Sequence, residues 1–503
     1  MSACVPFLSK RTIRQLSAGL MALATAMAPL HLSAQPTGIP SMGAASGVEL
    51  SPAVERSLGD AIMEQGRRDP AFVSDPDVTH YLTGLGRELA AHAPGGAGQH
   101  VSVFALRDSQ INAFALPGGY IGIHTGLFVA AESEAELAGV VAHEIGHVLQ
   151  RHVARGMTQS AQSNHILLAS MAGALLAALA GSGDLAMGVA AFGQAAAIDR
   201  QLGFSRQAEQ EADRVGYEML QRAGYDPRGM LRMFQRLAST ARLNEGTGGN
   251  VYTSTHPLSL QRLSDIEGRI RDGDAGRRVD NPEFWYLRAR MRLVQTRDKR
   301  GQDQAVAIFE RDARERKGVE QAAAHYGHAW YHWKQKAWAQ AREHLARAQA
   351  LGQPAPQLDE LAILLALDAG DVKTGLQLAD QAWRRWPQSQ GVAQARVHAF
   401  EANGQDKAVV AFTEACIAQW PGFSRMHQLR AQAYERLGEK VAARRAMAQY
   451  YESIGALPTA VEQLRQARSL TRDFYLQSEL DVQIRTLRDR LTAERALLER
   501  FRS

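Results

Sequence analysis

The chain has 503 residues, more than one hydrophobic core usually organises, so two or more domains are expected. Hydrophobic residues make up 45% of it and charged residues 22%, a composition that excludes a largely disordered protein. The formal net charge is only +5, which gives no field strong enough to argue for nucleic-acid binding.

The segment from Met1 to Ala34 has the three parts of a secretory signal. A basic start at Lys10 to Arg14 precedes an apolar run from Leu16 to Leu30, and small residues follow at Ser33 and Ala34. We expect residues 1–34 to be a signal peptide that is cleaved near Ala34. An uncleaved membrane anchor is the alternative.

The two cysteines predict neither a disulfide nor a lipid anchor. Cys4 leaves with the signal peptide, and Cys416 then remains alone. Cys4 also precedes the apolar run, whereas a lipid-attachment cysteine follows it.

Residues 35–280 are predicted to form the first globular domain. Val101, Val103 and Ala105 alternate with polar or differently facing neighbours, and residues 112–116 and 120–123 flank a Pro117-Gly118-Gly119 turn. This pattern indicates a small sheet that contains a hairpin.

A buried helix is expected directly after this sheet. Ser133 and Glu136 form a capping box at its start. The apolar residues that follow recur at helical spacing: Leu137, Val140, Val141 and Val148.

A regular period appears in the second half of the chain. Gly370, Gly404 and Gly438 are equally spaced, and Trp386-Pro387 recurs after the same interval as Trp420-Pro421. The interval matches the tetratricopeptide period of about 34 residues, in which the glycine lies between two helices and the proline ends the second.

Residues 281–503 are therefore expected to form an all-α tetratricopeptide solenoid. The template gives about five helix pairs between Gln321 and Leu491. We expect Trp386 and Trp420 to pack in its core rather than to bind a ligand.

His143-Glu144-Ile145-Gly146-His147 is an HExxH motif on the predicted buried helix. Residues four apart share a helix face, with about 5–6 Å between Cβ atoms, so both imidazoles can bind one Zn²⁺ at about 2.0–2.1 Å. Glu144 lies beside them, where its carboxylate can take a proton from a zinc-bound water whose pKa is lowered to about 7. We predict His143 and His147 as metal ligands and Glu144 as the catalytic general base.

A catalytic zinc usually has three protein ligands and one open position, so a third ligand is expected downstream. A second predicted helix, capped by Ser205, carries Glu209 and Asp213 four residues apart on one face. We predict that Glu209 binds the metal and that Asp213 orients His143 through its second ring nitrogen. Glu211 is the weaker rival ligand.

Four motifs together resemble one family of zinc peptidases. They are Asn112 to Gly119, His143 to His147, Ser205 to Asp213 and Ser254-Thr255-His256-Pro257. HExxH followed by ExxxD resembles the thermolysin-type arrangement, and the fuller set is similar to the peptidase family that includes the CAAX-prenyl protease and heat-shock membrane proteases. The predicted fold class is mainly α (α+β), with a zincin-like metallopeptidase domain that has a small sheet and one Zn²⁺ per chain, followed by the all-α tetratricopeptide solenoid.

The export signal and the repeat tail make the whole chain resemble periplasmic members of this family. The resemblance implies a periplasmic zinc endopeptidase and chaperone. Its implied partners are unfolded or misassembled outer-membrane polypeptides and the outer-membrane barrel-insertion complex. A peripheral contact with the outer membrane is also expected, and nucleic acid is not.

The resemblance also assigns a strand to substrate binding. Ala113, Phe114, Ala115 and Leu116 would form the edge strand onto which an extended substrate adds through main-chain hydrogen bonds. An ordinary core strand is the alternative.

His256 follows a glycine-rich loop, residues 244–250, and two roles for it remain open. As a catalytic residue it stabilises the oxyanion of the tetrahedral intermediate. As a regulatory residue, which the resemblance suggests, it occupies the open zinc position as a reversible plug. Arg262, further along, could assist charge stabilisation, but a surface arginine is expected.

Two remaining segments are open to more than one interpretation. Residues 166–198 are predicted to form a helical hairpin, which would be a lid, a membrane-contacting element or a packed helix pair. His325, His328 and His332 lie on one predicted helix of the tail, where a repeat surface is favoured over a metal site. His152 is not a ligand candidate.

These features are consistent with two functions. The first is a zinc endopeptidase. The second is a tetratricopeptide holdase or adaptor for the barrel-insertion machinery, with a largely latent protease site. A purely structural zinc is disfavoured, because such sites are rich in cysteine.

Overall fold

The computed structural model describes residues 51–94, 100–159, 204–243, 251–271, 276 and 278–502. The predicted signal peptide, the predicted hairpin at residues 166–198 and the glycine-rich loop before His256 lie outside these ranges. The chain divides into Met1–Ser41 and Met42–Ser503, and the description below concerns the second unit.

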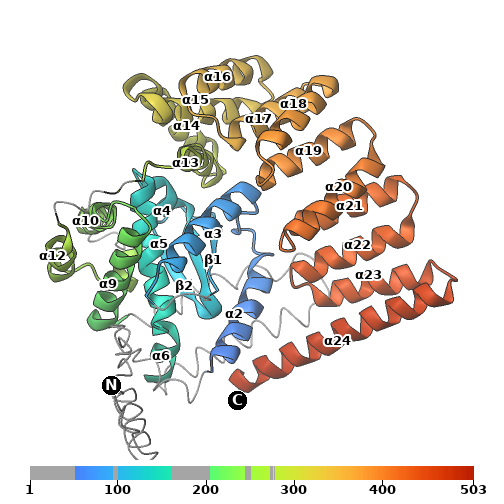
Figure 1. Cartoon of the computed structure of the whole chain (residues 1–503), viewed down its shortest axis with the longest axis horizontal. Coiled ribbons are helices and arrows are strands. Elements are labelled where there is room, and N and C mark those ends of the chain that lie inside the picture. Colours follow the sequence, from blue (N-terminus) through green and yellow to red (C-terminus); the bar gives the residue numbers. More distant parts are fainter. Residues whose placement is uncertain are drawn as a thin grey trace, which may run out of the picture. The chain divides into compact units, whose positions relative to one another are not determined.

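Helices make up most of the described residues up to Arg269 (Figure 1). They are α2 (Pro52–Gly66), α3 (Pro76–Ala91), α4 (Thr125–Ala130), α5 (Glu134–Leu149), α6 (His152–Gln159), α9 (Arg206–Arg222), α10 (Arg228–Leu243), α11 (Val251–Thr255) and α12 (Leu260–Arg269). Polar side chains cap several of them. Ser133 accepts a hydrogen bond from the amide of Glu136, and Ser205 accepts one from Ala208, as the sequence predicts.

A three-stranded sheet lies among these helices. Its strands are β1 (Ser102–Leu106), β2 (Ala113–Leu116) and β3 (Tyr120–His124), in the order β1-β3-β2. β1 runs parallel to β3, and β2 pairs antiparallel to β3 with Leu116 opposite Tyr120. The predicted hairpin is therefore confirmed.

The turn of this hairpin, η2 (Pro117–Gly119), depends on glycine. Gly118 and Gly119 have φ values of 79° and 85°, in the left-handed region. A Cβ on Gly119 would also lie 1.8 Å from the carbonyl oxygen of His100. The turn thus fixes the position of β2 relative to β3.

Helix α5 is the central element of this part of the chain. Every residue from Glu134 to His147 is buried, because α5 packs against α3, α9, α10 and β2. Gly146, inside the HExxH motif, meets the backbone of Ala212 on α9, where a Cβ would lie 2.8 Å from the carbonyl oxygen. The missing side chain lets α9 approach α5 closely, and Figure 1 shows the two helices side by side.

The rest of the chain is helical, which confirms the predicted helical tail. Its helices are α13 (Pro282–Val294), α14 (Lys299–Glu315), α15 (Gly318–Lys334), α16 (Trp338–Leu351), α17 (Pro356–Asp368), α18 (Val372–Arg385), α19 (Gln390–Ala402), α20 (Asp406–Gln419), α21 (Ser424–Arg436), α22 (Lys440–Ser453), α23 (Leu457–Ser469) and α24 (Phe474–Arg502). From α15 to α24 each helix packs against the next one along the chain.

The aromatic residues of the repeats pack as predicted. Trp386 lies against the apolar cluster that contains Ala382, and Trp420 lies against the cluster that contains Cys416. Cys416 is buried, and burial raises the pKa of its thiol to about 12.

The period of the tail sequence coincides with a recurring turn. Gly370, Gly404 and Gly438 each lie between two paired helices with φ values of 85°, 67° and 79°. Lys336, which precedes Gly370 by one further period, has a φ of 59° in the turn between α15 and α16. The period therefore extends to a pair in which lysine takes the glycine position.

We expect Lys336→Gly to raise the free energy of unfolding by roughly 0.5–1 kcal/mol. A left-handed backbone costs a non-glycine residue about 1–2 kcal/mol, and the substitution removes this cost. The greater freedom of glycine in the unfolded chain offsets about 0.4–1 kcal/mol of the stabilisation. Urea denaturation monitored by circular dichroism measures the change. Gly404→Lys is the matched reverse control, because nothing lies within 4 Å of a Cβ there and only the backbone cost is added. Destabilisation by Lys336→Gly would contradict this explanation.

Helix α13 packs against elements on both sides of it. Phe284 stacks on Phe128 of α4 with 5.7 Å between ring centroids. Arg290 is buried and forms ion pairs of 2.8 Å with Asp75, which caps α3, and of 2.5 Å with Glu360 of α17. The predicted domain boundary near residue 280 thus falls just before α13. This helix packs both against the helices that precede the boundary and against those of the tail.

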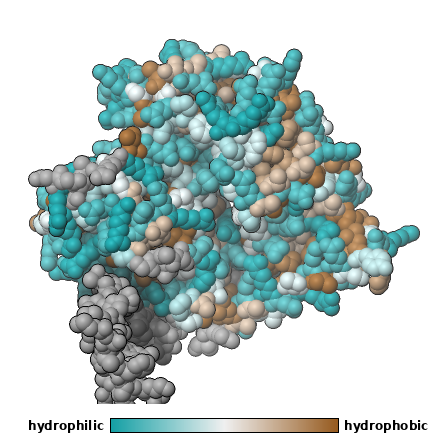
Figure 2. Space-filling model, viewed as in Figure 1, coloured by the Kyte–Doolittle hydropathy of each residue, from teal (hydrophilic) through white to brown (hydrophobic). Residues whose placement is uncertain are grey.

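Among the described residues, none of the helices combines the length and the apolar character that crossing a bilayer requires. Hydrophilic residues cover most of the face of the molecule shown in Figure 2.

Candidate metal centre

Helices α5 and α9 bring the three predicted metal ligands together. The Nε2 atoms of His143 and His147 lie 3.0 Å apart, and the carboxylate oxygens of Glu209 lie 3.5 Å and 3.4 Å from them. Ligand atoms of a tetrahedral zinc with bonds of about 2.0–2.1 Å are separated by roughly 3.3 Å. All three side chains are buried, so the donor set fits one divalent ion.

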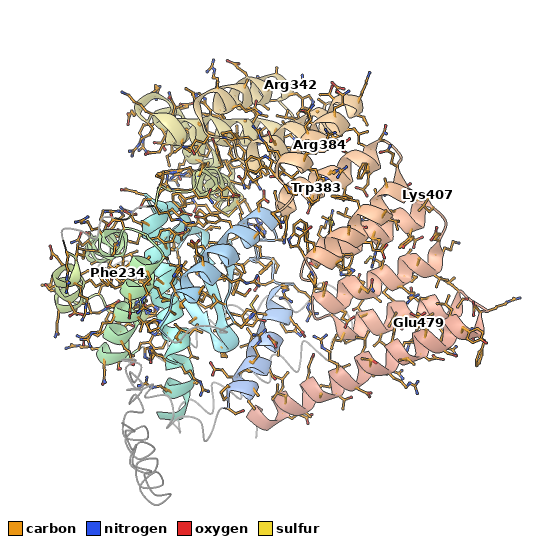
Figure 3. The ribbon with its side chains drawn as sticks, viewed as in Figure 1. Phe234, Arg342, Trp383, Arg384, Lys407 and Glu479 are labelled. Carbon is orange, nitrogen blue, oxygen red and sulfur yellow. The ribbon has the colours of Figure 1, made fainter. Side chains whose placement is uncertain are left out.

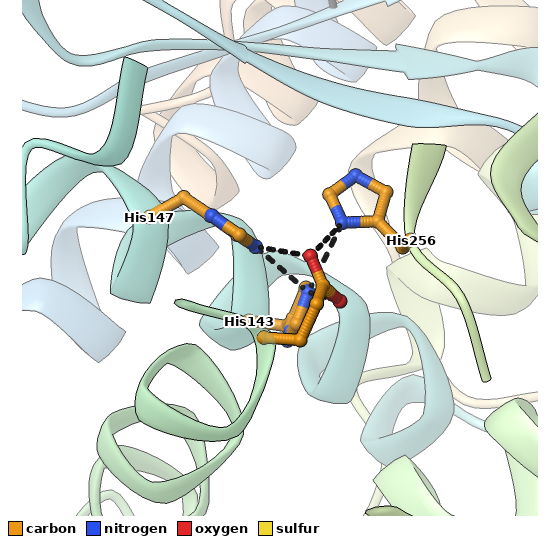
Figure 4. A group of neighbouring side chains, drawn as sticks. His143, His147 and His256 are labelled. Carbon is orange, nitrogen blue, oxygen red and sulfur yellow. Dashed lines mark hydrogen bonds and ion pairs between the residues drawn. The ribbon is translucent and has the colours of Figure 1, made fainter. Parts of the chain in front are cut away.

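His256 joins the same group from the segment between α11 and α12. Its Nδ1 lies 3.0 Å from Oε1 of Glu209 and 3.4 Å from Nε2 of His143. Figure 4 shows the three imidazoles around one carboxylate, and the four ligand atoms all lie within 4.8 Å of one another. The cluster thus has four potential donors, one more than a catalytic zinc usually takes from the protein.

Glu144 is completely buried beside this cluster. Its Oε1 lies 3.7 Å from Nε2 of His256, and it also interacts with Tyr252. Burial raises the pKa of Glu144 and outweighs the opposing effect of His256 and His143. The carboxyl group is therefore held within reach of the cluster without being part of it.

The second nitrogen of His143 contacts Asp213. Its Nδ1 lies 2.9 Å from Oδ1 of Asp213, one turn beyond Glu209 on α9. Burial alone would lower the pKa of His143, but the hydrogen bonds with Asp213 and Glu209 outweigh it and raise the pKa to about 9. Asp213 accepts a hydrogen bond from Nδ1, and a metal bound at Nε2 would displace the second proton that this raised pKa favours.

The second nitrogen of His147 contacts His152, a role that the sequence did not indicate. The two Nδ1 atoms lie 2.9 Å apart, and Nε2 of His152 lies 3.2 Å from Oε2 of Glu211. Glu211, the rival ligand, thus faces His152 and Arg155 and lies outside the cluster. His152 is not among the grouped ligands either.

Arg262 is buried, so the prediction that it is a surface arginine is wrong. Its Nε and Nη2 lie 2.7 Å and 2.8 Å from the two carboxylate oxygens of Asp213, and its Nη1 lies 2.5 Å from Oε2 of Glu209. Two buried carboxylates need a counter-charge, which this guanidinium supplies. The available signal was Ile266, one turn further along α12, which marks the same helix face as buried.

Aromatic rings surround the cluster, and the sequence did not reveal them. Phe234 of α10, labelled in Figure 3, has its ring centroid 5.5 Å from that of His143. Phe204 lies 4.0 Å from His147, and Tyr252 stacks on His256 at 4.6 Å. These rings restrict the imidazoles and lower the local dielectric constant, which strengthens the polar interactions inside.

The predicted substrate strand is β2, which lies next to α5. The side chains of Ala113, Phe114, Ala115 and Leu116 are all buried, as a core strand requires. Its backbone pairs with β3 on one side, and no described strand pairs with the other side.

Residues 76–270, which include all the grouped side chains, match the model of peptidase family M48. The chain is 34% identical over 311 residues to a putative β-barrel assembly-enhancing protease of Vibrio cholerae, covering 61% of this chain and 63% of that protein. It is 35% identical over 254 residues to the β-barrel assembly-enhancing protease of Escherichia coli, 50% of this chain and 51% of that protein. With its counterpart in Yersinia pestis it shares 32% identity over 343 residues, 68% of each chain. The matches thus span about half to two thirds of these relatives.

Proposed function

Since the chain belongs to the family of the β-barrel assembly-enhancing proteases, within peptidase family M48, we propose that it is a zinc-dependent endopeptidase. The observation that carries this proposal is the buried convergence of His143, His147 and Glu209 from α5 and α9. Two imidazoles and one carboxylate are a typical ligand set of catalytic zinc. When bound there, Zn²⁺ would polarise the scissile carbonyl and lower the pKa of water.

Removal of the metal tests this proposal directly. Dialysis of the purified chain against a chelator is expected to abolish casein cleavage, and added Zn²⁺ is expected to restore it. Cleavage that persists in metal-free protein, shown by elemental analysis of the same sample, would argue against a metallopeptidase.

The surrounding side chains have complementary roles in this proposal. Glu144 accepts a proton from the attacking water and passes it to the leaving amine. Asp213 holds the ring of His143 so that Nε2 faces the metal position. Arg262 balances the negative charges of Glu209 and Asp213. It therefore acts on a metal ligand and on the residue that orients His143, and not on the substrate.

His256 is proposed to be a regulatory plug that keeps the site latent. The 3.0 Å and 3.4 Å separations from Glu209 and His143 support this role, because they are those of a fourth ligand. An oxyanion stabiliser would instead leave that position open for water and substrate. The glycine-rich sequence before His256 is compatible with release of the plug.

We expect His256→Ala to raise kcat/KM for casein about tenfold or more. If the open form is a minor state, populated at about 0.1–10%, removing the plug makes every molecule competent. Turnover and zinc content are measured on the same preparation. His398→Ala, on α19 in the tail, controls for the loss of an imidazole elsewhere and should not change the rate. Lost turnover with zinc retained would support the oxyanion role instead.

The proposed organisation is a signal peptide at 1–34, a peptidase domain at 35–280 and a tetratricopeptide domain at 281–503. The regularly spaced left-handed turns of the tail support the tetratricopeptide assignment. Extended substrates would add to the open edge of β2, where main-chain hydrogen bonds tolerate many sequences.

The names of the relatives refer to the assembly of β-barrels, and they support a similar setting for this chain. We propose that it acts in the periplasm, as protease and chaperone, on unfolded or misassembled outer-membrane polypeptides. The outer-membrane barrel-insertion complex would be its partner, with a peripheral contact to that membrane.

A second function is favoured by the position of His256. If the site is mostly plugged, the helical tail would act as a holdase or adaptor without hydrolysis. Complementation separates the two functions, because full rescue of a strain lacking the gene by Glu144→Gln would show that hydrolysis is dispensable.

A further inference from the structure

Four histidines gather on the first repeat pair of the tail, away from α5 and α9. Helix α15 carries His325, His328 and His332, and helix α16 carries His344. The ligand nitrogens of His328, His332 and His344 all lie within 4.8 Å of one another. His325 lies next to them, with its Nδ1 3.2 Å from Nδ1 of His344.

The spacing on α15 is the one that suits a metal-binding pair. His328 and His332 are four residues apart, as are His143 and His147 in the HExxH motif. Residues at this spacing share a helix face, so two imidazoles can reach one ion. His344 supplies a third nitrogen from the neighbouring helix, as Glu209 supplies an oxygen in the first cluster. The sequence alone did not link His344 to the other three.

The group combines buried and partly exposed imidazoles. His325 and His328 are buried, whereas His332 and His344 are partly exposed, so an ion can reach the group from solvent. The Nδ1 atom of His328 is buried and has no hydrogen-bond partner among the described residues. A buried polar atom without a partner is destabilising, and a ligand would remove that cost.

A cation close to these histidines is partly balanced by an acid. Arg347, the nearby cation, is paired at 2.5 Å with Glu343, which limits its repulsion of an ion.

We propose that His328, His332 and His344 form a second metal site, which binds a divalent transition-metal ion such as Zn²⁺ or Cu²⁺, with His325 beside it. Imidazole-rich sites prefer these ions over Mg²⁺ or Ca²⁺, which take oxygen ligands. The bound ion would join α15 to α16 and stabilise the pair in which Lys336 occupies the left-handed turn. The site is independent of the proposed peptidase activity.

Zinc stoichiometry of the full-length, tag-free chain tests this site. After removal of metal, the wild-type chain is expected to bind two Zn²⁺ ions, measured by equilibrium dialysis and elemental analysis. The double variant His332→Asn/His344→Asn should bind one, because both replacements lie at partly exposed positions of the tail. His398→Asn is the matched control, a tail histidine outside the group, and should retain two. The variant His143→Ala/His147→Ala should also bind one.

A second readout does not depend on the fold of a tail variant. In the His143→Ala/His147→Ala chain, Cu²⁺ should quench the fluorescence of Trp330 and Trp333, which lie beside His328 and His332 on α15. Zn²⁺ added first should prevent the quenching. A His332→Asn/His344→Asn chain that binds as much Zn²⁺ as the wild type, or quenching that Zn²⁺ does not affect, would overturn the second site.

Discussion

Replacing Glu144 with glutamine is expected to lower kcat/KM for casein by about 10²–10⁴-fold while the metal stays bound. Glutamine has the size of glutamate but cannot accept the proton of the attacking water, which is the contribution of a general base. The three proposed ligands, His143, His147 and Glu209, remain unchanged. Turnover and zinc content of the same preparation measure the two effects separately.

Glu211→Gln is the matched control for this variant. Glu211 is an acid close to the cluster, but its carboxylate faces His152 and Arg155. Its replacement should change kcat/KM far less than Glu144→Gln does. Full activity of Glu144→Gln would rule out a general base at this position, and loss of zinc from it would mean that Glu144 acts through the metal site.

Replacing Arg262 with methionine is expected to lower the free energy of unfolding by about 3–5 kcal/mol. Methionine keeps much of the volume but removes the guanidinium that contacts both Glu209 and Asp213. Breaking a buried ion pair by removing one partner leaves an uncompensated buried charge, which accounts for that magnitude. The measurement is urea unfolding of the metal-free chain, so that bound zinc does not mask the effect.

Arg214→Met is the control for Arg262→Met. Arg214 forms a 3.8 Å pair with Asp265, and its side chain is 47% exposed. Exposed pairs contribute about 0–1 kcal/mol, so this variant should unfold close to wild type. Equal stability of the two variants would mean that the Arg262 network does not carry the proposed charge balance.

Much of the fold follows from local patterns in the sequence. The helical spacing of Leu137, Val140 and Val141 predicts α5, and the Pro117-Gly118-Gly119 turn predicts the hairpin of β2 and β3. The regular spacing of the tail glycines predicts the paired helices of the tail. These features depend on residues near one another in the chain, so a periodicity or a turn signal is enough.

The features that the sequence missed depend on contacts between distant segments. Arg262 shares a helix face with Ile266, but only the approach of α12 to two carboxylates on α9 explains why a charged side chain is buried there. The glycine spacing does not reveal the turn between α15 and α16, because Lys336 and not a glycine occupies its left-handed position. His344 lies on another helix from His328, so no spacing rule joins them.

The position of the metal gives the most direct test of the proposed ligand set. Crystals of the chain grown with Zn²⁺ would be measured on both sides of the zinc absorption edge, and an anomalous difference map would locate the ion. We expect a peak about 2.0–2.2 Å from Nε2 of His143, Nε2 of His147 and a carboxylate oxygen of Glu209. A map without a peak at this position, or with the peak beyond coordinating distance of Glu209, would contradict this ligand set.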